Sequence, residues 1–152
     1  MYNVSGMKTI AVNKKARFNY FITDEIEAGI VLEGSEVKSI RSGNVSLNES
    51  FVIIQKDEIF LKNAYIKPYE KAGVFIPDSR RNRKLLLSKQ EILKLEKKIE
   101  AQGFTILPLK IYLKGNFVKV QIGVGKGKKL YDKREDLKEK TIKKDLQRKS
   151  YI

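Results

Sequence analysis

The sequence predicts a mainly β protein with helical inserts: an OB-fold-like barrel of about six antiparallel strands with two or three helices, followed by a basic tail. Apolar and polar residues alternate over several short segments, as in half-buried strands, and two other segments have helical periodicity. The last 27 residues hold 11 basic and 5 acidic residues, a net charge of +6, among few apolar ones. We therefore expect a barrel domain over residues 1–125 and a tail over residues 126–152 that is disordered in the free protein.

The first strand is expected over residues 17–22, and it continues beyond a Glu-Ala-Gly tripeptide over residues 30–32. A short helix is expected next, over residues 34–43, because glycines bracket this segment and its apolar residues lie at helical spacing. Ser35 is a possible N-cap of this helix, since serine side chains accept hydrogen bonds from the free amides of a first turn.

Residues 51–55 and 59–66 are expected to pair as a hairpin, because the three charged residues between them disfavour strands. A longer helix is expected after Ser88, which has the spacing of a capping box with Glu91. Apolar residues at helical spacing follow, and Gly103 is the expected terminator.

The clearest strands come last, over residues 107–113 and 118–124, where apolar residues alternate with lysine and glutamine. A short connection that contains a glycine separates them, so they are expected to form a second hairpin. Among barrels of short strands with few helices, the OB-like barrel is a common one that binds nucleic acid.

The charge favours a polyanionic partner, because 32 basic and 18 acidic residues leave a net charge of +14 and a pI of about 9.8. The chain has no cysteine and no histidine, which excludes thiol nucleophiles, imidazole relays, disulfides and ordinary zinc sites. It contains no phosphate-binding loop of the P-loop type, and we expect no cofactor. No leader pattern and no apolar run of about 18 residues is visible, so we expect a soluble, cytoplasmic protein with no membrane partner.

Carboxylates are densest at Asp24, Glu25 and Glu27, which together with Glu33 and Glu36 could be a magnesium site for phosphodiester cleavage. We favour the alternative that they are a solvated strand edge. The chain is accordingly expected not to be an enzyme and to hold no metal.

Three groups of residues could contact nucleic acid. The first is a basic group, Arg80, Arg81, Arg83 and Lys84, expected in a loop and favoured for phosphate contact. The second is the glycine- and lysine-rich segment 123–129, which is either a close approach to phosphates or a flexible exit from the barrel. The third is a set of aromatic residues that either stack on bases or pack in the core: Tyr20, Phe21, Tyr65, Tyr69 and Tyr112.

The tail has strong helix formers and acid-before-base pairs four residues apart, but too few apolar residues to dock on the barrel. We favour a segment that becomes helical when a polyanion supplies contacts, over an inert solubilising tail.

Six stretches, taken in order, resemble the small protein B family, the SsrA-binding proteins that partner transfer-messenger RNA. They are AVNKKAR (11–17), EAGI (27–30), GSEVKSIRSG (34–43), RKLLL (83–87), KVQIG (119–123) and GKKLYDKR (127–134). The resemblance implies an OB-like barrel that grips the tRNA-like domain of this RNA, travels with elongation factor Tu and enters a stalled 70S ribosome. It also implies a monomer that works in trans-translation and breaks no bond.

The same resemblance implies two sets of site residues. The RNA-facing residues of the barrel would be Asn13, Lys14, Glu27, Leu86 and Lys119. The residues of the tail that meet 16S ribosomal RNA in the decoding centre and the empty messenger channel would be Gly127, Lys128, Lys129, Tyr131, Asp132, Lys133, Arg134, Lys138 and Ile142. Many members have His at the position of Tyr131 and Trp at that of Ile142. Tyr131 can still stack on a base, whereas Ile142 lacks a broad aromatic face.

Two alternatives to this function remain at this point. One is a general single-strand-binding or ribosomal OB-fold protein, which would show steep salt dependence and little discrimination among sequences. The other is a metal-dependent nuclease that uses Asp24, Glu25 and Glu27.

Overall fold

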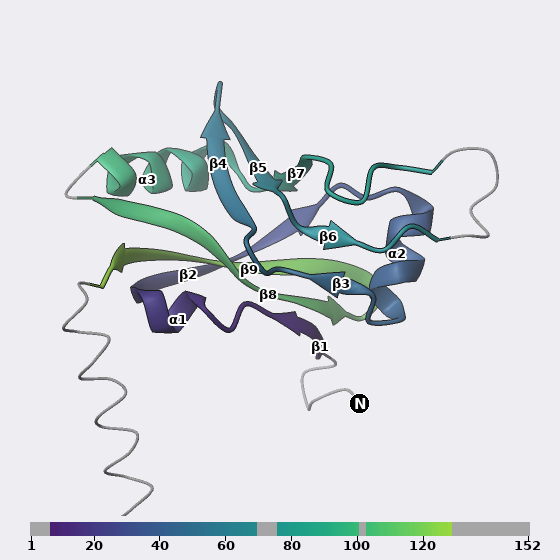
Figure 1. Cartoon of the computed structure of the whole chain (residues 1–152). Helices are drawn as coiled ribbons and strands as arrows, with labels where there is room; N and C mark the ends of the chain where they lie inside the picture. The colour runs from purple at the N-terminus through teal and green to yellow at the C-terminus, as the bar shows by residue number, and fades with distance from the viewer. Residues whose placement is uncertain (1–6, 70–75, 101–102, 129–152) are drawn as a thin grey trace, which may run out of the picture.

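The computed structural model describes residues 7–69, 76–100 and 103–128. Within these ranges it contains three helices and nine strands (Figure 1). In chain order they are β1 (Met7–Val12), α1 (Ala16–Asn19), β2 (Tyr20–Ile30), α2 (Gly34–Arg41), β3 (Val45–Ser46), β4 (Phe51–Gln55), β5 (Glu58–Lys62), β6 (Tyr65–Ile66), β7 (Arg83–Leu86), α3 (Lys89–Glu100), β8 (Phe104–Lys114) and β9 (Phe117–Gly127). The mainly β fold with helical inserts is confirmed.

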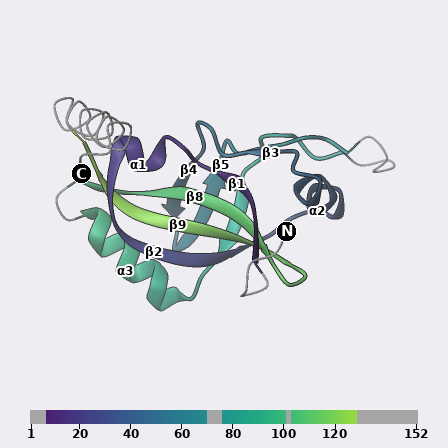
Figure 2. The ribbon, with the colours of Figure 1, turned by 90° about the horizontal axis from the view of Figure 1, so that it is seen from below.

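Seven strands form one antiparallel sheet in the order β1-β8-β9-β2-β7-β5-β4, and β3 pairs with β6 in a small second sheet. The large sheet curves strongly, with α3 and α2 at its two ends (Figures 1 and 2). No ladder joins β1 to β4 in the described ranges, so the barrel is partly open at this seam.

The hairpin expected at residues 107–124 is confirmed and is longer than the alternation predicts. Strands β8 and β9 pair from Phe104 with Lys126 to Lys114 with Phe117. Gly115, in the turn, has a φ of 60°, which a glycine adopts without steric cost.

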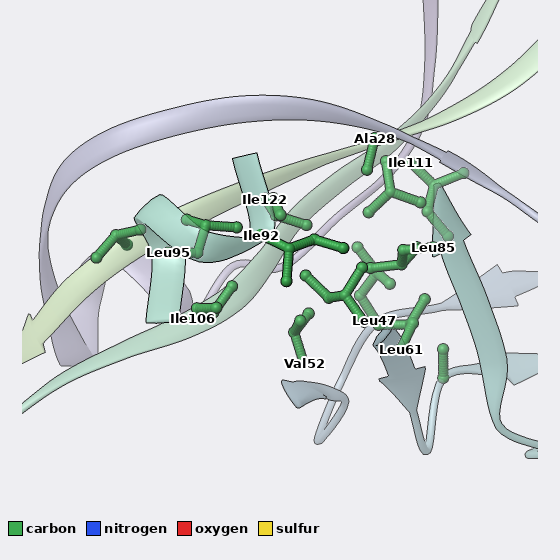
Figure 3. Close-up of a cluster of buried hydrophobic side chains, with 14 of the residues drawn as sticks. Ala28, Leu47, Val52, Leu61, Leu85, Ile92, Leu95, Ile106, Ile111 and Ile122 are labelled. Atoms are coloured by element: carbon green, nitrogen blue, oxygen red, sulfur yellow. The ribbon is translucent and has the colours of Figure 1, made fainter. Parts of the chain in front are cut away.

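The core fills the concave side of the sheet. Side chains of β4, β5, β7, β8 and β9 meet there, and Ile92 and Leu95 of α3 close one end (Figure 3). The start of α3 is the predicted capping box, because the Ser88 Oγ accepts from the Glu91 amide at 3.2 Å and the Glu91 carboxylate accepts from the Ser88 amide at 3.1 Å. The positive φ of Gly103, 74°, agrees with its expected role after the helix.

The prediction of the first strand is partly wrong. Residues 16–19 form α1, and β2 then runs without interruption from Tyr20 through Glu27 and Gly29 to Ile30. The cause is a tertiary contact. Ala16 is 2% exposed and packs with Leu107 and Leu109 of β8, which holds this turn of helix against the sheet.

The helix expected at residues 34–43 is confirmed as α2, but its N-cap is Glu33 and not Ser35. The Glu33 side chain accepts from the third amide of the helix, and Glu36 accepts from the Glu33 amide at 2.9 Å. A glutamate pair therefore forms the capping box here, and Ser35 lies inside the helix.

The strand expected over residues 59–66 is broken at Asn63, whose φ is 62°. The preceding turn has positive φ at both Lys56 and Asp57, as a two-residue hairpin turn requires. Strands β1, β3 and β7 were not predicted from the sequence, and β7 lies where a loop is expected.

Strand β9 ends at Gly127, two residues beyond the expected domain boundary at residue 125. The division into a barrel and a tail stays a prediction, because residues 129–152 lie outside the described ranges. No helix of the described chain is long and apolar enough to cross a membrane.

Candidate nucleic-acid interface

Strand register brings three of the five predicted barrel residues onto one surface. Lys119 of β9 and Leu86 of β7 both lie opposite Gly29 of β2, and Glu27 precedes Gly29 by two residues on the same side of β2. Because successive side chains of a strand point to opposite faces, and the neighbours Ala28, Leu85 and Val120 are core residues, these three side chains face away from the core. We call this surface the outer face, and its members are Glu27, Leu86, Lys110, Tyr112, Lys114, Phe117, Lys119 and Gln121.

Glu27 occupies the middle of the outer face and is held by two neighbours from β8. The Tyr112 hydroxyl donates to its Oε2, and the Lys114 ammonium lies 3.4 Å from both carboxylate oxygens. The Tyr112 hydrogen bond, with Lys114 and the nearby charge of Lys119, keeps the pKa of Glu27 below its ordinary value although burial opposes this. Glu27 is therefore an ionised acceptor, with a side chain 33% exposed.

Lysines and aromatic rings alternate around this carboxylate. The Lys119 ammonium lies 5.6 Å from the centre of the Phe117 ring, and the Lys110 ammonium lies 5.3 Å from the centre of the Tyr112 ring. Phe117, the first residue of β9, is 69% exposed. It was not predicted as a site residue, because it precedes the alternating segment that begins at Val118. Cations beside a carboxylate and an exposed ring are groups that bind phosphates, base edges and base faces.

Leu86 is 52% exposed, although its strand neighbour Leu85 is buried. Its side chain packs over Gly29, where an added Cβ would lie 3.2 Å from the Leu86 Cβ. Leu86 also lines a cleft of about 570 Å³ between α3 and strands β5 and β7, together with the exposed Leu93. The outer face therefore has an apolar side next to its charged centre.

Asn13 and Lys14 lie apart from the other three, just beyond the end of β1. The Asn13 backbone amide donates to the Leu109 carbonyl at 2.8 Å, and its side-chain amide donates to the Pro108 carbonyl at 2.9 Å. Lys14 is exposed. Three strand spacings separate β1 from β2, about 14 Å, so an RNA segment could contact both places.

The carboxylates of the acidic cluster pair with different neighbours. Asp24 pairs with Lys98 of α3, and Glu25 pairs with Arg17 at 2.9 Å. No group of three metal-ligating side chains lies together among the residues that the structure describes. Asp24 and Glu25 are both exposed, as a solvated strand edge requires, whereas the Glu27 side chain is only 33% exposed.

The basic group before α3 was expected to contact phosphates, and this is wrong for Arg83. Arg83 is fully buried, with its Nη2 2.7 Å from a carboxylate oxygen of Glu36 and its Nη1 2.8 Å from the Ala64 carbonyl. Arg81 also pairs with Glu36, and Lys84 pairs with Glu58 at 3.0 Å. The charges belong mainly to ion pairs that fasten β7 to α2 and β5.

The glycine-rich segment 123–129 begins inside β9, not in a flexible exit. An added Cβ at Gly123 would lie 2.9 Å from the Leu109 Cδ1, and one at Gly125 would lie 2.9 Å from the Phe21 carbonyl oxygen. These glycines therefore allow close packing within the barrel. Beyond them the Lys128 ammonium lies 4.9 Å from the centre of the Phe21 ring.

The predicted aromatic residues do not form a stacking surface with Lys119. Tyr112 shares the outer face but is fully buried, and Tyr65 and Tyr69 lie beneath Arg80 and Lys38. Phe21, on β2 near the end of β9, is 49% exposed.

Of the predicted ribosome-facing residues, Gly127 ends β9, and the Lys128 amide donates to the Asn19 carbonyl at 2.9 Å. The others lie outside the described residues: Lys129, Tyr131, Asp132, Lys133, Arg134, Lys138 and Ile142.

The chain is similar to known proteins over most of its length. The family profile described as "SmpB protein" matches residues 10–151. The SsrA-binding protein of Borreliella afzelii (strain PKo) is 52% identical over 136 residues, which cover 90% of this chain and 91% of that protein. The SsrA-binding protein of Geobacillus thermodenitrificans (strain NG80-2) is 52% identical over 141 residues, which cover 93% and 91%.

A solved structure has the same fold. It is described as "tmRNA-SmpB: a journey to the center of the bacterial ribosome", and the matched chain is 46% identical with a TM-score of 0.65. The match covers 78% of this chain and 84% of that one.

Proposed function

Since this chain belongs to the SmpB family, we propose that it binds transfer-messenger RNA through the outer face and acts with that RNA on the ribosome in trans-translation. The observation that carries the proposal is the convergence of Glu27, Leu86 and Lys119 on one exposed surface of a chain with a net charge of +14. The relatives of this chain are SsrA-binding proteins, and SsrA RNA is another name for transfer-messenger RNA.

Lys119, Glu27 and Leu86 have distinct parts in the proposal. Lys119, together with the nearby lysines, binds phosphates and supplies affinity that depends on salt. The ionised Glu27 accepts hydrogen bonds from a base edge, and Leu86 packs against an unpaired base or a sugar. Because a carboxylate repels phosphates, its place in the centre of a basic surface favours a folded RNA that presents a donor there over an arbitrary strand.

Asn13 and Lys14 extend the proposed RNA contact across β8 and β9 to the end of β1. An RNA that reaches from Leu86 on β7 to Asn13 spans four strand spacings, about 19 Å, close to the diameter of a nucleic-acid duplex.

The tail completes the proposal. Residues from Gly127 onward enter the decoding centre of a stalled 70S ribosome, where the lysines and arginine meet 16S ribosomal RNA and Tyr131 stacks on a base. Residues near Lys138 and Ile142 follow as a helix along the empty messenger channel. Elongation factor Tu delivers the complex to the ribosome. In this proposal the protein is a cytoplasmic monomer that acts as an adaptor and not as an enzyme.

A competition gel shift tests the RNA contact. The labelled transfer-messenger RNA is bound to the full chain at 150 mM salt and competed with the unlabelled RNA, its tRNA-like domain, or a random single strand of equal length. We expect both specific competitors to displace the label at concentrations at least about 100-fold lower than the random strand does. Equal competition by all three would support the general single-strand binder instead.

Deletion of residues 129–152 separates the barrel from the tail while leaving β9 whole. We expect the shortened chain to keep binding the tRNA-like domain within a few-fold and to lose tagging of nascent chains on stalled ribosomes. If binding falls in proportion to the lost charge, the division of roles is wrong. Full tagging by the shortened chain would contradict the role of the tail.

A further inference from the structure

Tyr112 combines two properties that no other tyrosine of the described chain has. Its side chain belongs to the outer face, because Tyr112 lies opposite Lys119, yet it is fully buried. Only its hydroxyl reaches the surface network, where it donates to Glu27 and lies 3.3 Å from the Gln121 Oε1. A ring buried in this way has little freedom to turn, so its hydroxyl is a fixed point.

The other partners of Glu27 are of a different kind. Lys114 is half-exposed and lies 3.4 Å from each carboxylate oxygen, at the end of a long flexible chain. Lys119 acts on the Glu27 carboxylate only through its charge. A lysine of this kind neutralises a carboxylate without fixing its direction, whereas a tyrosine hydroxyl on a buried ring fixes one oxygen.

We propose that Tyr112 is a positioning residue for RNA recognition, whose buried hydroxyl holds the Glu27 Oε2 so that Oε1 is aimed outward to accept from a base edge. The inference rests on the proposed function of the outer face and adds a residue to it. Tyr112 itself does not touch RNA, because its ring is covered. It acts by removing the rotational freedom that Glu27 would otherwise lose on binding.

The tyrosine also controls the protonation of the acceptor. Its hydrogen bond contributes most to lowering the pKa of Glu27, and burial, together with the same carboxylate, raises the pKa of Tyr112. Both shifts favour a phenol that donates and a carboxylate that accepts. An acceptor fixed in both direction and charge discriminates strongly against a base that offers no donor.

A double-mutant cycle tests the inference in the full chain. The dissociation constant for transfer-messenger RNA is measured for the unchanged protein, Tyr112→Phe, Glu27→Ala and the double variant. Phenylalanine keeps the buried ring and removes only the hydroxyl. We expect Tyr112→Phe to weaken binding about 5- to 10-fold, Glu27→Ala to weaken it more, and the double variant to bind no more weakly than Glu27→Ala.

The outcomes separate this inference from the function on which it rests. If Glu27→Ala leaves binding unchanged, the proposed role of the outer face fails. If Glu27→Ala weakens binding but Tyr112→Phe does not, or if the two effects simply multiply, the positioning role of Tyr112 is overturned and the outer face still stands.

A second readout reports on the hydrogen bond itself. The Glu27 carboxyl carbon is titrated by nuclear magnetic resonance in the unchanged protein and in Tyr112→Phe. We expect the pKa of Glu27 to rise in the variant, which a general loss of packing elsewhere would not produce. Tyr65→Phe is the matched control, since Tyr65 lies on β6 in the second sheet, and it should change neither the titration nor the RNA affinity. An unchanged titration in Tyr112→Phe would contradict the inference.

Discussion

Lys119 and Leu86 lie on either side of the same residue, Gly29, in three adjacent strands. Gly29 presents no side chain between them, and Leu86 leans over it closely enough that an added Cβ would lie 3.2 Å from the Leu86 Cβ and 3.3 Å from its Cδ1. Lys119, Gly29 and Leu86 thus form a row across the three strands: a charged side chain, a bare backbone and an apolar side chain. Its shape therefore depends on the absence of a side chain at position 29.

The variant Gly29→Val tests this dependence. The branched side chain has to displace Leu86 and to separate it from Lys119, so we expect affinity for transfer-messenger RNA to fall about tenfold while the fold is kept. Filter binding measures the affinity, and circular dichroism checks the fold. Gly34→Ala is the control, because no atom lies within 4 Å of an added Cβ there, and it should bind normally. Normal binding by Gly29→Val would show that the row is not part of the interface.

Lys119→Ala tests the electrostatic part of the outer face. If Lys119 contacts one phosphate, its loss should weaken binding and reduce the slope of log K against log salt by about 1. The matched control is Lys97→Ala, which removes the same charge from the exposed side of α3. Binding measured from 50 to 300 mM salt gives both slopes. Equal slopes for the two variants would mean that the lysine acts only through the net charge of the protein.

Local patterns of residues predicted their elements correctly. The alternation in residues 107–124 gave the β8–β9 hairpin, and Ser88 with Glu91 gave the start of α3, because strand alternation and capping depend on neighbours in the chain. Helix α1 was not predicted, because Ala16 is held by Leu107 and Leu109, about 90 residues away in sequence.

The same distinction holds for the site. The resemblance to the family predicted Glu27, Leu86 and Lys119 as site residues. Only the pairing of β2 with both β7 and β9 brings them together. Arg83 looked like a surface cation because Arg80, Arg81 and Lys84 surround it. Its partner Glu36 lies 47 residues earlier, so its burial could not be read from local charge. Tyr112 was a candidate for base stacking. Its burial and its hydrogen bond to Glu27 depend on tertiary contacts, which the sequence does not show.

Glu36→Ala tests the buried ion pair. Arg83 is fully buried and its Nε donates to Glu36 at 2.8 Å, so loss of the carboxylate leaves a buried charge without its counter-ion. We expect the free energy of unfolding to fall by about 3 to 5 kcal/mol, measured by urea denaturation. Glu25→Ala breaks the exposed pair with Arg17 and should cost about 0 to 1 kcal/mol. A loss in Glu36→Ala as small as that in Glu25→Ala would show that the buried pair is not needed for stability.

The pH dependence of stability should reveal the same carboxylate. Burial alone would raise the pKa of Glu36, but hydrogen bonds from Arg81, the Glu33 amide and Arg83 outweigh it and hold the pKa below its ordinary value of 4.5. In the unfolded chain the group titrates near that ordinary value, so the unfolded state binds the proton more readily. The stabilisation by Glu36 is therefore complete above about pH 4.5 and is lost as the pH falls through the lower, folded-state pKa. Urea denaturation of the unchanged protein and of Glu36→Gln between pH 2.5 and 7 should show their stabilities differing most above pH 5 and converging in acid, because glutamine cannot titrate. A difference that stays constant over this range would mean that the ionised form of Glu36 is not what secures Arg83.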